Sequence, residues 1–169
     1  MHTRIFLIGF MGSGKSTLGA QLARRLDYQF MDMDQLIEET AELSIPEIFQ
    51  DHGEVVFRKW EHDILLELCS RDKLVISTGG GAPCHSQNMD LMNANGCTIY
   101  LNLTPLALQN RLIQSRTERP LIKGKTDAEL FDFITTLLEK REKFYKQASH
   151  IVDGLSLRSE DLAALILDS

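Results

Sequence analysis

Residues 9–16 read GFMGSGKS, and this segment constrains the fold more than any other part of the chain. It follows a continuous apolar run at residues 5–8 and precedes leucines at helical spacing, Leu18, Leu22 and Leu26. A buried strand, a glycine-rich loop and an amphipathic helix in this order are typical of a phosphate-binding P-loop. The glycines let backbone N–H groups and the helix N-terminus converge on a phosphate. The segment therefore predicts nucleotide binding.

The polar residues of this loop have separate expected roles. Lys15, which we expect to face solvent, would reach the β- and γ-phosphates, and the Ser16 hydroxyl would ligate Mg²⁺. The residues expected to bind the nucleotide are consecutive: Gly12, Ser13, Gly14, Lys15, Ser16 and Thr17.

Four further apolar runs predict strands, at residues 30–31, 74–76, 98–101 and 151–152. Amphipathic segments lie between them, and strands that alternate with helices imply a parallel sheet with helices on both faces. The chain has neither an internal repeat nor a Gly-, Ser- or Pro-rich linker. We therefore predict an α/β fold of the P-loop NTPase type, with a five-stranded parallel sheet in a single domain over residues 1–169.

The composition narrows the classes of partner. A net charge of −6 and a pI near 5.3 argue against broad binding of nucleic acid or of an anionic membrane. Three cysteines without metal-ligand spacing favour reduced thiols, and the N-terminal apolar run is too short for a signal peptide. We expect a cytoplasmic protein that acts as a monomer on small molecules.

Several helix starts can be read directly. Residues 44–47 and 126–129 both have the Ser/Thr-x-x-Glu capping box, and Thr104 precedes a first-turn proline. Residues 115–125 are polar and irregular between two predicted helices. We name them the lid segment, because a mobile cationic loop can close over phosphates. It holds Arg116, Arg119 and Lys123 around residues 119–121.

Two carboxylates, Asp32 and Asp34, close the second predicted strand. Near a P-loop, one suits the Mg²⁺ shell and the other an acceptor hydroxyl. The alternative is that either residue only caps the helix that follows.

Other charged or flexible positions are ambiguous when considered alone. Arg58 can pair with Glu54 and Glu61 on one helix, which is usually a solvated surface network. Arg141 falls in an apolar stripe, where it either extends past the core to solvent or points into an anion site. Residues 79–81 are three glycines after a strand, and they either form a flexible turn or expose backbone to a ligand.

Taken together, these motifs resemble the shikimate kinase family from about residue 5 to about residue 166. The resemblance rests on residues 9–16, on Asp32-x-Asp34 and on four further segments: residues 48–61, 79–81, 119–121 and 141–145. It implies that ATP phosphorylates the 3-hydroxyl of shikimate, in the route to chorismate and the aromatic amino acids.

The resemblance also implies roles for particular residues. Those that would bind shikimate are Asp34, Arg58, Gly80 and Arg141, and both arginines would contact its carboxylate. Residues 34–61 would form the helical region that binds shikimate. Asp32 would join Ser16 at the metal, and Arg119 and Arg158 would contact ATP. The catalytic set is Lys15, Asp34 and Arg119, and whether Asp34 is a true base is left open.

Two other functions fit parts of the sequence. A P-loop kinase of gluconate or of a nucleoside monophosphate would share the loop and the fold. A catalytically silent nucleotide-binding or regulatory protein would have kept the fold without the activity, although the intact Lys15, Ser16, Asp32 and Asp34 argue against it.

Overall fold

The computed structural model describes residues 3–115 and 119–167. Each of the five predicted apolar runs forms a strand, and all strands pair in parallel in one sheet of order β2-β3-β1-β4-β5. The predicted fold class is therefore confirmed. The strands are β1 (Arg4–Ile8), β2 (Gln29–Asp32), β3 (Leu74–Ser77), β4 (Cys97–Asn102) and β5 (His150–Asp153).

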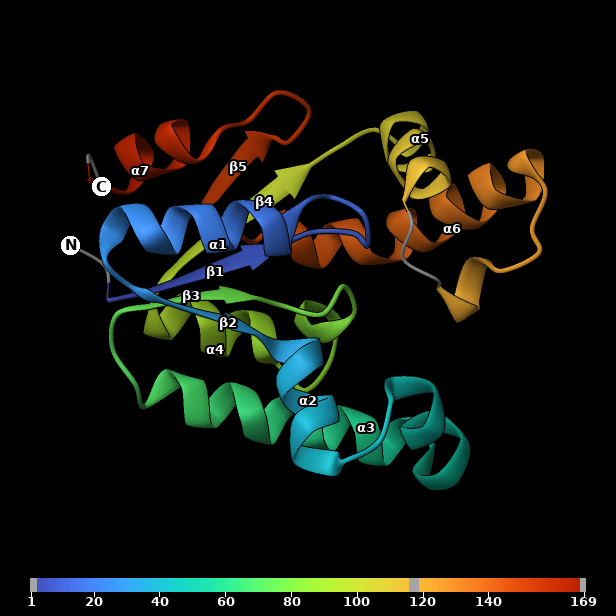
Figure 1. The fold of residues 1–169 in the computed structure, drawn as a ribbon, viewed down its shortest axis with the longest axis horizontal. Helices are drawn as coiled ribbons and strands as arrows, with labels where there is room; N and C mark the ends of the chain where they lie inside the picture. The colour runs from blue at the N-terminus through green and yellow to red at the C-terminus, as the bar shows by residue number, and fades with distance from the viewer. Residues whose placement is uncertain (1–2, 116–118, 168–169) are drawn as a thin grey trace.

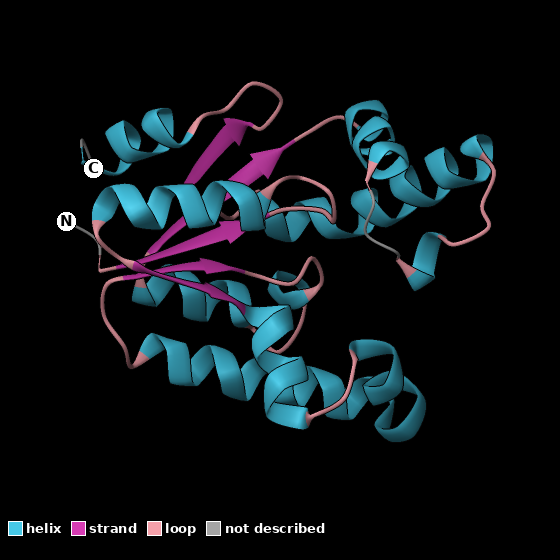
Figure 2. Cartoon of the chain, in the orientation of Figure 1, coloured by secondary structure: helices cyan, strands magenta, loops and turns pink. Residues whose placement is uncertain are grey.

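Helices cover both faces of the sheet (Figures 1 and 2). Helices α1 and α7 lie side by side, on the opposite side of the sheet from α3 and α4. Helix α5 packs on α6 beyond the carboxyl ends of the strands. The helices are α1 (Lys15–Leu26), α2 (Met33–Ala41), α3 (Ile45–Cys69), α4 (Asn88–Asn95), α5 (Pro105–Gln114), α6 (Asp127–Tyr145) and α7 (Ser159–Leu167). Two short 3-10 helices are η1 (Ala82–Cys84) and η2 (Pro120–Ile122).

The predicted helix caps form as the sequence indicates. Ser44 and Thr126 each complete a capping box with the glutamate three residues later, at the starts of α3 and α6. The Thr104 hydroxyl accepts a hydrogen bond from the backbone N–H of Ala107 at the start of α5. These local bonds satisfy backbone donors that a helix N-terminus leaves unpaired.

The central strands form the core because helices cover them on both faces. Every residue of β3 is buried, and so are residues 5–8 of β1 and 97–101 of β4. Continuous apolar runs, rather than alternating ones, are what such a doubly covered parallel sheet requires. The rigid centre of the sheet holds the loops that follow β1 and β3.

Within the part of the chain that the structure describes, no helix has the length and apolar character needed to cross a membrane. The three cysteines, Cys69, Cys84 and Cys97, are free thiols.

Candidate active site

The carboxyl ends of three strands bring the predicted site together. Ser77 of β3 is in register with Leu7 of β1 on one side and with Asp32 of β2 on the other. The segments that follow these strands are the P-loop, the glycine run at residues 79–81 and helix α2. They therefore leave the sheet at the same edge, which is where open α/β sheets bind ligands.

The P-loop wraps tightly before α1. Gly12 and Gly14 have φ values of 78° and 97°, which is backbone that favours glycine. The backbone N–H of Ser13, a buried residue, donates to the Phe10 carbonyl at 3.1 Å. Thr17 is exposed in the first turn of α1. The turn matches the one that the glycine spacing predicts.

Lys15 is buried, contrary to the expectation from sequence that it faces solvent. Its side chain is 8% exposed, and its ammonium group donates to the carbonyls of Gly9 at 2.7 Å and Phe10 at 3.0 Å. Burial lowers the pKa of Lys15 to about 8, against the opposing effect of Asp34 and Asp32. The loop's own carbonyl groups thus solvate the lysine.

Ser16 and Asp32 meet across the site. The Ser16 hydroxyl donates to Asp32 Oδ2 at 2.6 Å, and Ser77 Oγ lies 3.4 Å from Ser16 Oγ. The other Asp32 oxygen caps α2 by accepting from the backbone N–H groups of Asp34 and Gln35. Asp32 is therefore a helix cap, and it is also the acidic neighbour of Ser16.

Asp34 lies in the first turn of α2 and points to the glycine run. A Cβ atom on Gly79 would lie 2.7 Å from Asp34 Oδ1 and 3.1 Å from Glu61 Oε1. Burial raises the pKa of Asp34, and the neighbouring Asp32 raises it further, whereas Lys15 lowers it. A carboxylate with a raised pKa is closer to what general base catalysis at neutral pH requires.

The remaining two glycines lie against arginines. A Cβ atom on Gly80 would lie 3.1 Å from a terminal nitrogen of Arg141, and one on Gly81 would lie 2.7 Å from a terminal nitrogen of Arg58. A Cβ atom on Gly81 would force the Arg58 guanidinium to move, and one on Gly80 would make a tight contact with Arg141. The glycine run therefore exposes backbone without side chains, and Arg58 of α3 and Arg141 of α6 both lie against it.

Arg58 is not part of a solvated surface network. Its side chain is 16% exposed, and it donates at 2.9 Å to Glu61, which is 1% exposed. Glu54, which is exposed, pairs more loosely with the Arg58 Nε at 3.5 Å. A buried carboxylate therefore fixes one edge of the guanidinium.

Arg141 reaches the site from α6. Its guanidinium carbon lies 5.8 Å from the centroid of the Phe10 ring, a distance at which a cation is attracted to an aromatic face. This contact and the approach to Gly80 place the group against the loops after β1 and β3. The side chain therefore does not extend past the core to solvent.

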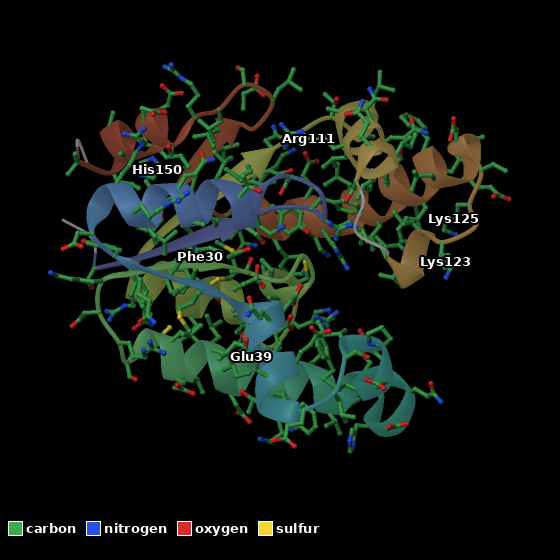
Figure 3. The ribbon with its side chains drawn as sticks, in the orientation of Figure 1. Phe30, Glu39, Arg111, Lys123, Lys125 and His150 are labelled. Carbon is green, nitrogen blue, oxygen red and sulfur yellow. The ribbon has the colours of Figure 1, made fainter. Side chains whose placement is uncertain are left out.

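Arg119, at the start of η2, is the one lid arginine within the described residues. Arg116 lies outside them. Burial lowers the pKa of Arg119 against the opposing charge of Asp34, and its buried Nε lacks a hydrogen-bond partner within the described residues. Lys123 is exposed, and Figure 3 shows it with Lys125 at the outer end of this segment.

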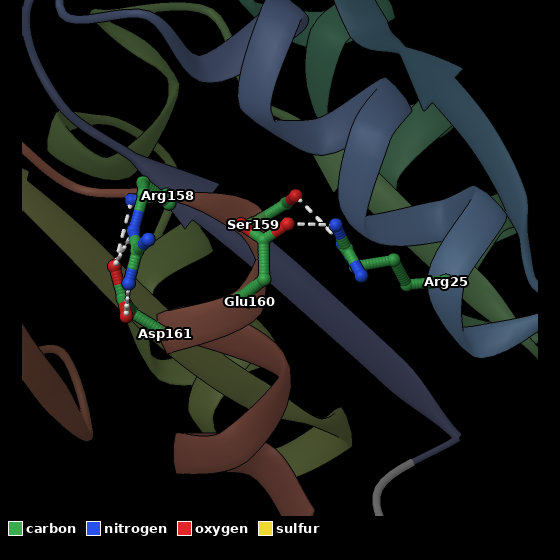
Figure 4. A network of polar contacts seen from close by, with 5 residues as sticks. All are labelled: Arg25, Arg158, Ser159, Glu160 and Asp161. Carbon is green, nitrogen blue, oxygen red and sulfur yellow. Dashed lines mark hydrogen bonds and ion pairs between the residues drawn. The ribbon is translucent and has the colours of Figure 1, made fainter.

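Arg158 takes no part in this convergence. Its side chain is 71% exposed and forms an ion pair of 3.1 Å with Asp161 in the first turn of α7 (Figure 4). It borders an open hollow of about 560 Å³ beside α1, in which Arg25 pairs with Glu160 and donates to Ser159 at 2.9 Å. The residues lining this hollow do not include any residue of the P-loop.

Arg111 is a residue that the sequence reasoning missed. From α5 it donates to the Ser13 carbonyl at 3.0 Å and to the Gly154 carbonyl at 2.9 Å, so it ties the P-loop to the loop after β5 (Figure 3). Its position between Leu108 and Leu112, on the buried side of a short helix, is the signal that could have identified it.

Comparison with known proteins decides the family. The family model described as shikimate kinase matches residues 11–169. A shikimate kinase of Bacteroides fragilis is 47% identical over 159 residues, which is 93% of this chain and 89% of that protein. The chain belongs to the shikimate kinase family.

Solved structures agree with this membership. The shikimate kinase of Bacteroides thetaiotaomicron superposes with a TM-score of 0.93 at 42% identity, over 99% of this chain and 98% of that one. The shikimate kinase of Acinetobacter baumannii, solved in complex with shikimate, gives a TM-score of 0.86 at 34% identity, over 98% of this chain and 91% of that one. A gluconokinase of Sinorhizobium meliloti shares only the fold, at 18% identity and a TM-score of 0.60.

Proposed function

We propose that this member of the shikimate kinase family transfers the γ-phosphoryl group of ATP to the 3-hydroxyl of shikimate, giving shikimate 3-phosphate and ADP. The observation that carries the proposal is the convergence of Arg58 and Arg141 on residues 79–81, beside the P-loop. Shikimate has one carboxylate, and a guanidinium pairs with a carboxylate through two parallel hydrogen bonds. The product belongs to the route to chorismate and the aromatic amino acids.

The nucleotide phosphates bind at residues 12–17 in this proposal. Backbone N–H groups of the loop and the N-terminus of α1 provide partial positive charge for them. The Lys15 ammonium group already lies in the loop, where it donates to the carbonyls of Gly9 and Phe10. When ATP binds, it would exchange these carbonyls for phosphate oxygens.

The residues present fit a magnesium ion. Mg²⁺ prefers oxygen ligands and usually takes one or two from the protein, with the rest from phosphates and water. Ser16 Oγ and the Asp32 carboxylate supply such oxygens 2.6 Å apart, with Ser16 as the ligand and Asp32 toward the surrounding shell. The ion would supply charge neutralisation at the transferring phosphoryl group.

Phosphoryl transfer requires positioning and charge stabilisation more than covalent participation by the enzyme. We assign Asp34 to the acceptor hydroxyl, which it would orient and from which it would take the proton. Its burial and raised pKa support this role. Lys15 and Arg119 would share the negative charge that develops on the transferring group.

Two regions would serve the substrates. The lid segment, residues 115–125, carries Arg119 to the phosphates, and residues 34–61 form most of the shikimate side. Arg158 stays a candidate for the adenine side, and it must leave Asp161 to act there.

We also propose that the protein acts as a monomer in the cytoplasm, without nucleic-acid or membrane partners. One chain supplies every residue of the proposed site. Three free thiols suit a reducing compartment, and the net charge of −6 disfavours polyanions.

An ADP-release assay with several acceptors tests the function. We expect ATP turnover with shikimate, and none above background with gluconate or with nucleoside monophosphates. Turnover with gluconate alone would instead favour a gluconate kinase. ATP binding without turnover on any acceptor would favour a nucleotide-binding regulator.

A further inference from the structure

Tyr145 is a buried tyrosine whose hydroxyl reaches the glycine run. It lies at the C-terminal end of α6 and is 0% exposed. Its hydroxyl donates to the Gly80 carbonyl at 2.5 Å, across 65 residues of sequence. This bond joins α6 directly to the backbone on which the proposed substrate site is built.

The same helix turn carries Arg141. A helix places residues four apart on one face, so Tyr145 and Arg141 approach Gly80 together. The Arg141 guanidinium lies 3.1 Å from where a Cβ atom of Gly80 would be. Burial raises the pKa of Tyr145, and the adjacent Arg141 opposes that rise. The hydroxyl therefore remains protonated, and it donates.

The ring of Tyr145 is held in place from the sheet side. It packs against the ring of Tyr100 in β4, with ring centroids 5.1 Å apart and planes tilted by 43°. Aromatic pairs of this kind favour tilted, offset arrangements. The packed ring thus holds the hydroxyl at the Gly80 carbonyl. This contact restricts the backbone of Gly80, and glycine has the widest conformational freedom of any residue.

We propose that Tyr145 is a positioning residue for the shikimate site, and that its hydroxyl fixes the Gly80 peptide so that Arg141 meets the substrate carboxylate in a single geometry. The inference rests on the proposed function, because it assumes that Gly80 and Arg141 bind shikimate. It adds a residue that does not itself touch the substrate.

The test compares Tyr145→Phe with a matched control, Tyr100→Phe. Both changes remove one hydroxyl from a buried ring of the same aromatic pair, and only Tyr145 bonds to Gly80. We expect Tyr145→Phe to raise the KM for shikimate about three- to tenfold, which is the size of one hydrogen bond, with kcat and the KM for ATP within about twofold of wild type. Tyr100→Phe should leave all three constants near wild type.

Shikimate titrations by calorimetry, without nucleotide, give a second readout that does not depend on turnover. They are run at a temperature where thermal melts show each variant folded. The affinity loss of Tyr145→Phe should shrink in an Arg141→Ala background, because the hydroxyl acts partly through Arg141.

Three results would overturn the inference. One is a wild-type KM and affinity for shikimate in folded Tyr145→Phe. Another is an equal rise in the KM for ATP, which indicates a general structural defect. The third is an equal effect of Tyr100→Phe. If the wild-type protein does not phosphorylate shikimate at all, the proposed function fails as well, whereas these three results leave it intact.

Discussion

The Ser16 hydroxyl donates a 2.6 Å hydrogen bond to the Asp32 carboxylate, and this bond joins the first turn of α1 to the cap of α2. One Asp32 oxygen faces Ser16 while the other accepts from two backbone N–H groups of α2. A single residue thus combines a structural duty with a proposed role at the metal. The two roles can be separated experimentally, because only one of them requires a charge.

Asp32→Asn should keep the fold and impair the metal function. Asparagine caps helices about as well as aspartate, so the melting temperature should stay close to that of wild type. The variant lacks the carboxylate charge, so we expect a higher Mg²⁺ concentration for half-maximal activity and a lower kcat. Asp32→Ala should show both defects, with about 1 kcal/mol of stability lost with the cap. Wild-type Mg²⁺ dependence in Asp32→Asn would restrict Asp32 to the capping role.

The buried ammonium of Lys15 should make stability depend on pH. Its pKa is lowered to about 8 in the folded protein, so between pH 8 and the ordinary value of 10.5 the unfolded chain binds more protons. Stability that depends on Lys15 therefore rises with pH in that window. Relative to Lys15→Met, wild type should gain on the order of 1 kcal/mol per pH unit, and about 3 kcal/mol over the whole window.

Urea unfolding of both proteins at pH 7, 8, 9 and 10 measures this difference. A difference between the two proteins that does not change with pH would show that the Lys15 pKa is near its ordinary value.

Lys15→Ala should abolish phosphoryl transfer, because the loop then lacks the cation that meets the phosphates. Because Lys15 is buried, the change also leaves the Gly9 and Phe10 carbonyls without their donor, so the variant's fold must be checked by circular dichroism. Near wild-type turnover in the folded variant would remove Lys15 from the mechanism.

Arg119→Ala should affect ATP more than shikimate. We assign this lid arginine to the phosphates, so turnover or ATP affinity should fall about tenfold or more, while shikimate affinity measured without nucleotide stays near wild type. The exposed Lys123 at the same loop is a matched control, and Lys123→Ala should have little effect. An equal loss of shikimate binding in Arg119→Ala would contradict the assignment.

Gly81→Ala should displace Arg58 without unfolding the chain. Gly81 has φ of −89° and ψ of −16°, which alanine adopts freely, but its Cβ atom would lie 2.7 Å from an Arg58 nitrogen. The guanidinium is the flexible end of a side chain and can shift, so the melting temperature should change little. We expect the KM for shikimate to rise severalfold while the KM for ATP is retained. An unchanged KM for shikimate would show that Arg58 is not held against this peptide for substrate binding.

The sequence was most informative where the determinants are local. The strands, the capping boxes at Ser44 and Thr126 and the P-loop turn all depend on residues a few positions apart, so pattern reasoning predicted them. The parallel sheet followed from the alternation of strands and helices. Which side chains become buried beside these strands, however, depends on how the whole chain packs.

The sequence could not predict contacts between distant segments. Lys15 belongs to a loop that usually faces solvent, and its burial depends on how residues 9–14 wrap around it. Arg111 bonds to Ser13 across 98 residues, and Tyr145 bonds to Gly80 across 65. The spacing of Arg58 and Glu61 predicted that they pair. That the pair is buried became evident only from the fold, which packs the glycine run against both side chains.

The central claim is that Arg58 and Arg141 together bind the carboxylate of shikimate. Either change to alanine should weaken shikimate binding by about 1.5 to 3 kcal/mol, and the two effects should not add, because both residues serve one ligand group. Arg58→Lys should remain impaired, since lysine keeps the charge without the planar pair of donors.

The most direct measurement is the ratio of the dissociation constants of methyl shikimate and shikimate, determined by calorimetry for wild type and for the Arg58→Ala/Arg141→Ala double variant. The methyl ester replaces the charged carboxylate by a neutral ester with one added methyl group, so wild type should bind shikimate at least about tenfold more tightly than the ester. In the folded double variant the ratio should fall close to one. A ratio that stays at the wild-type value in the double variant would place the carboxylate elsewhere and contradict the account.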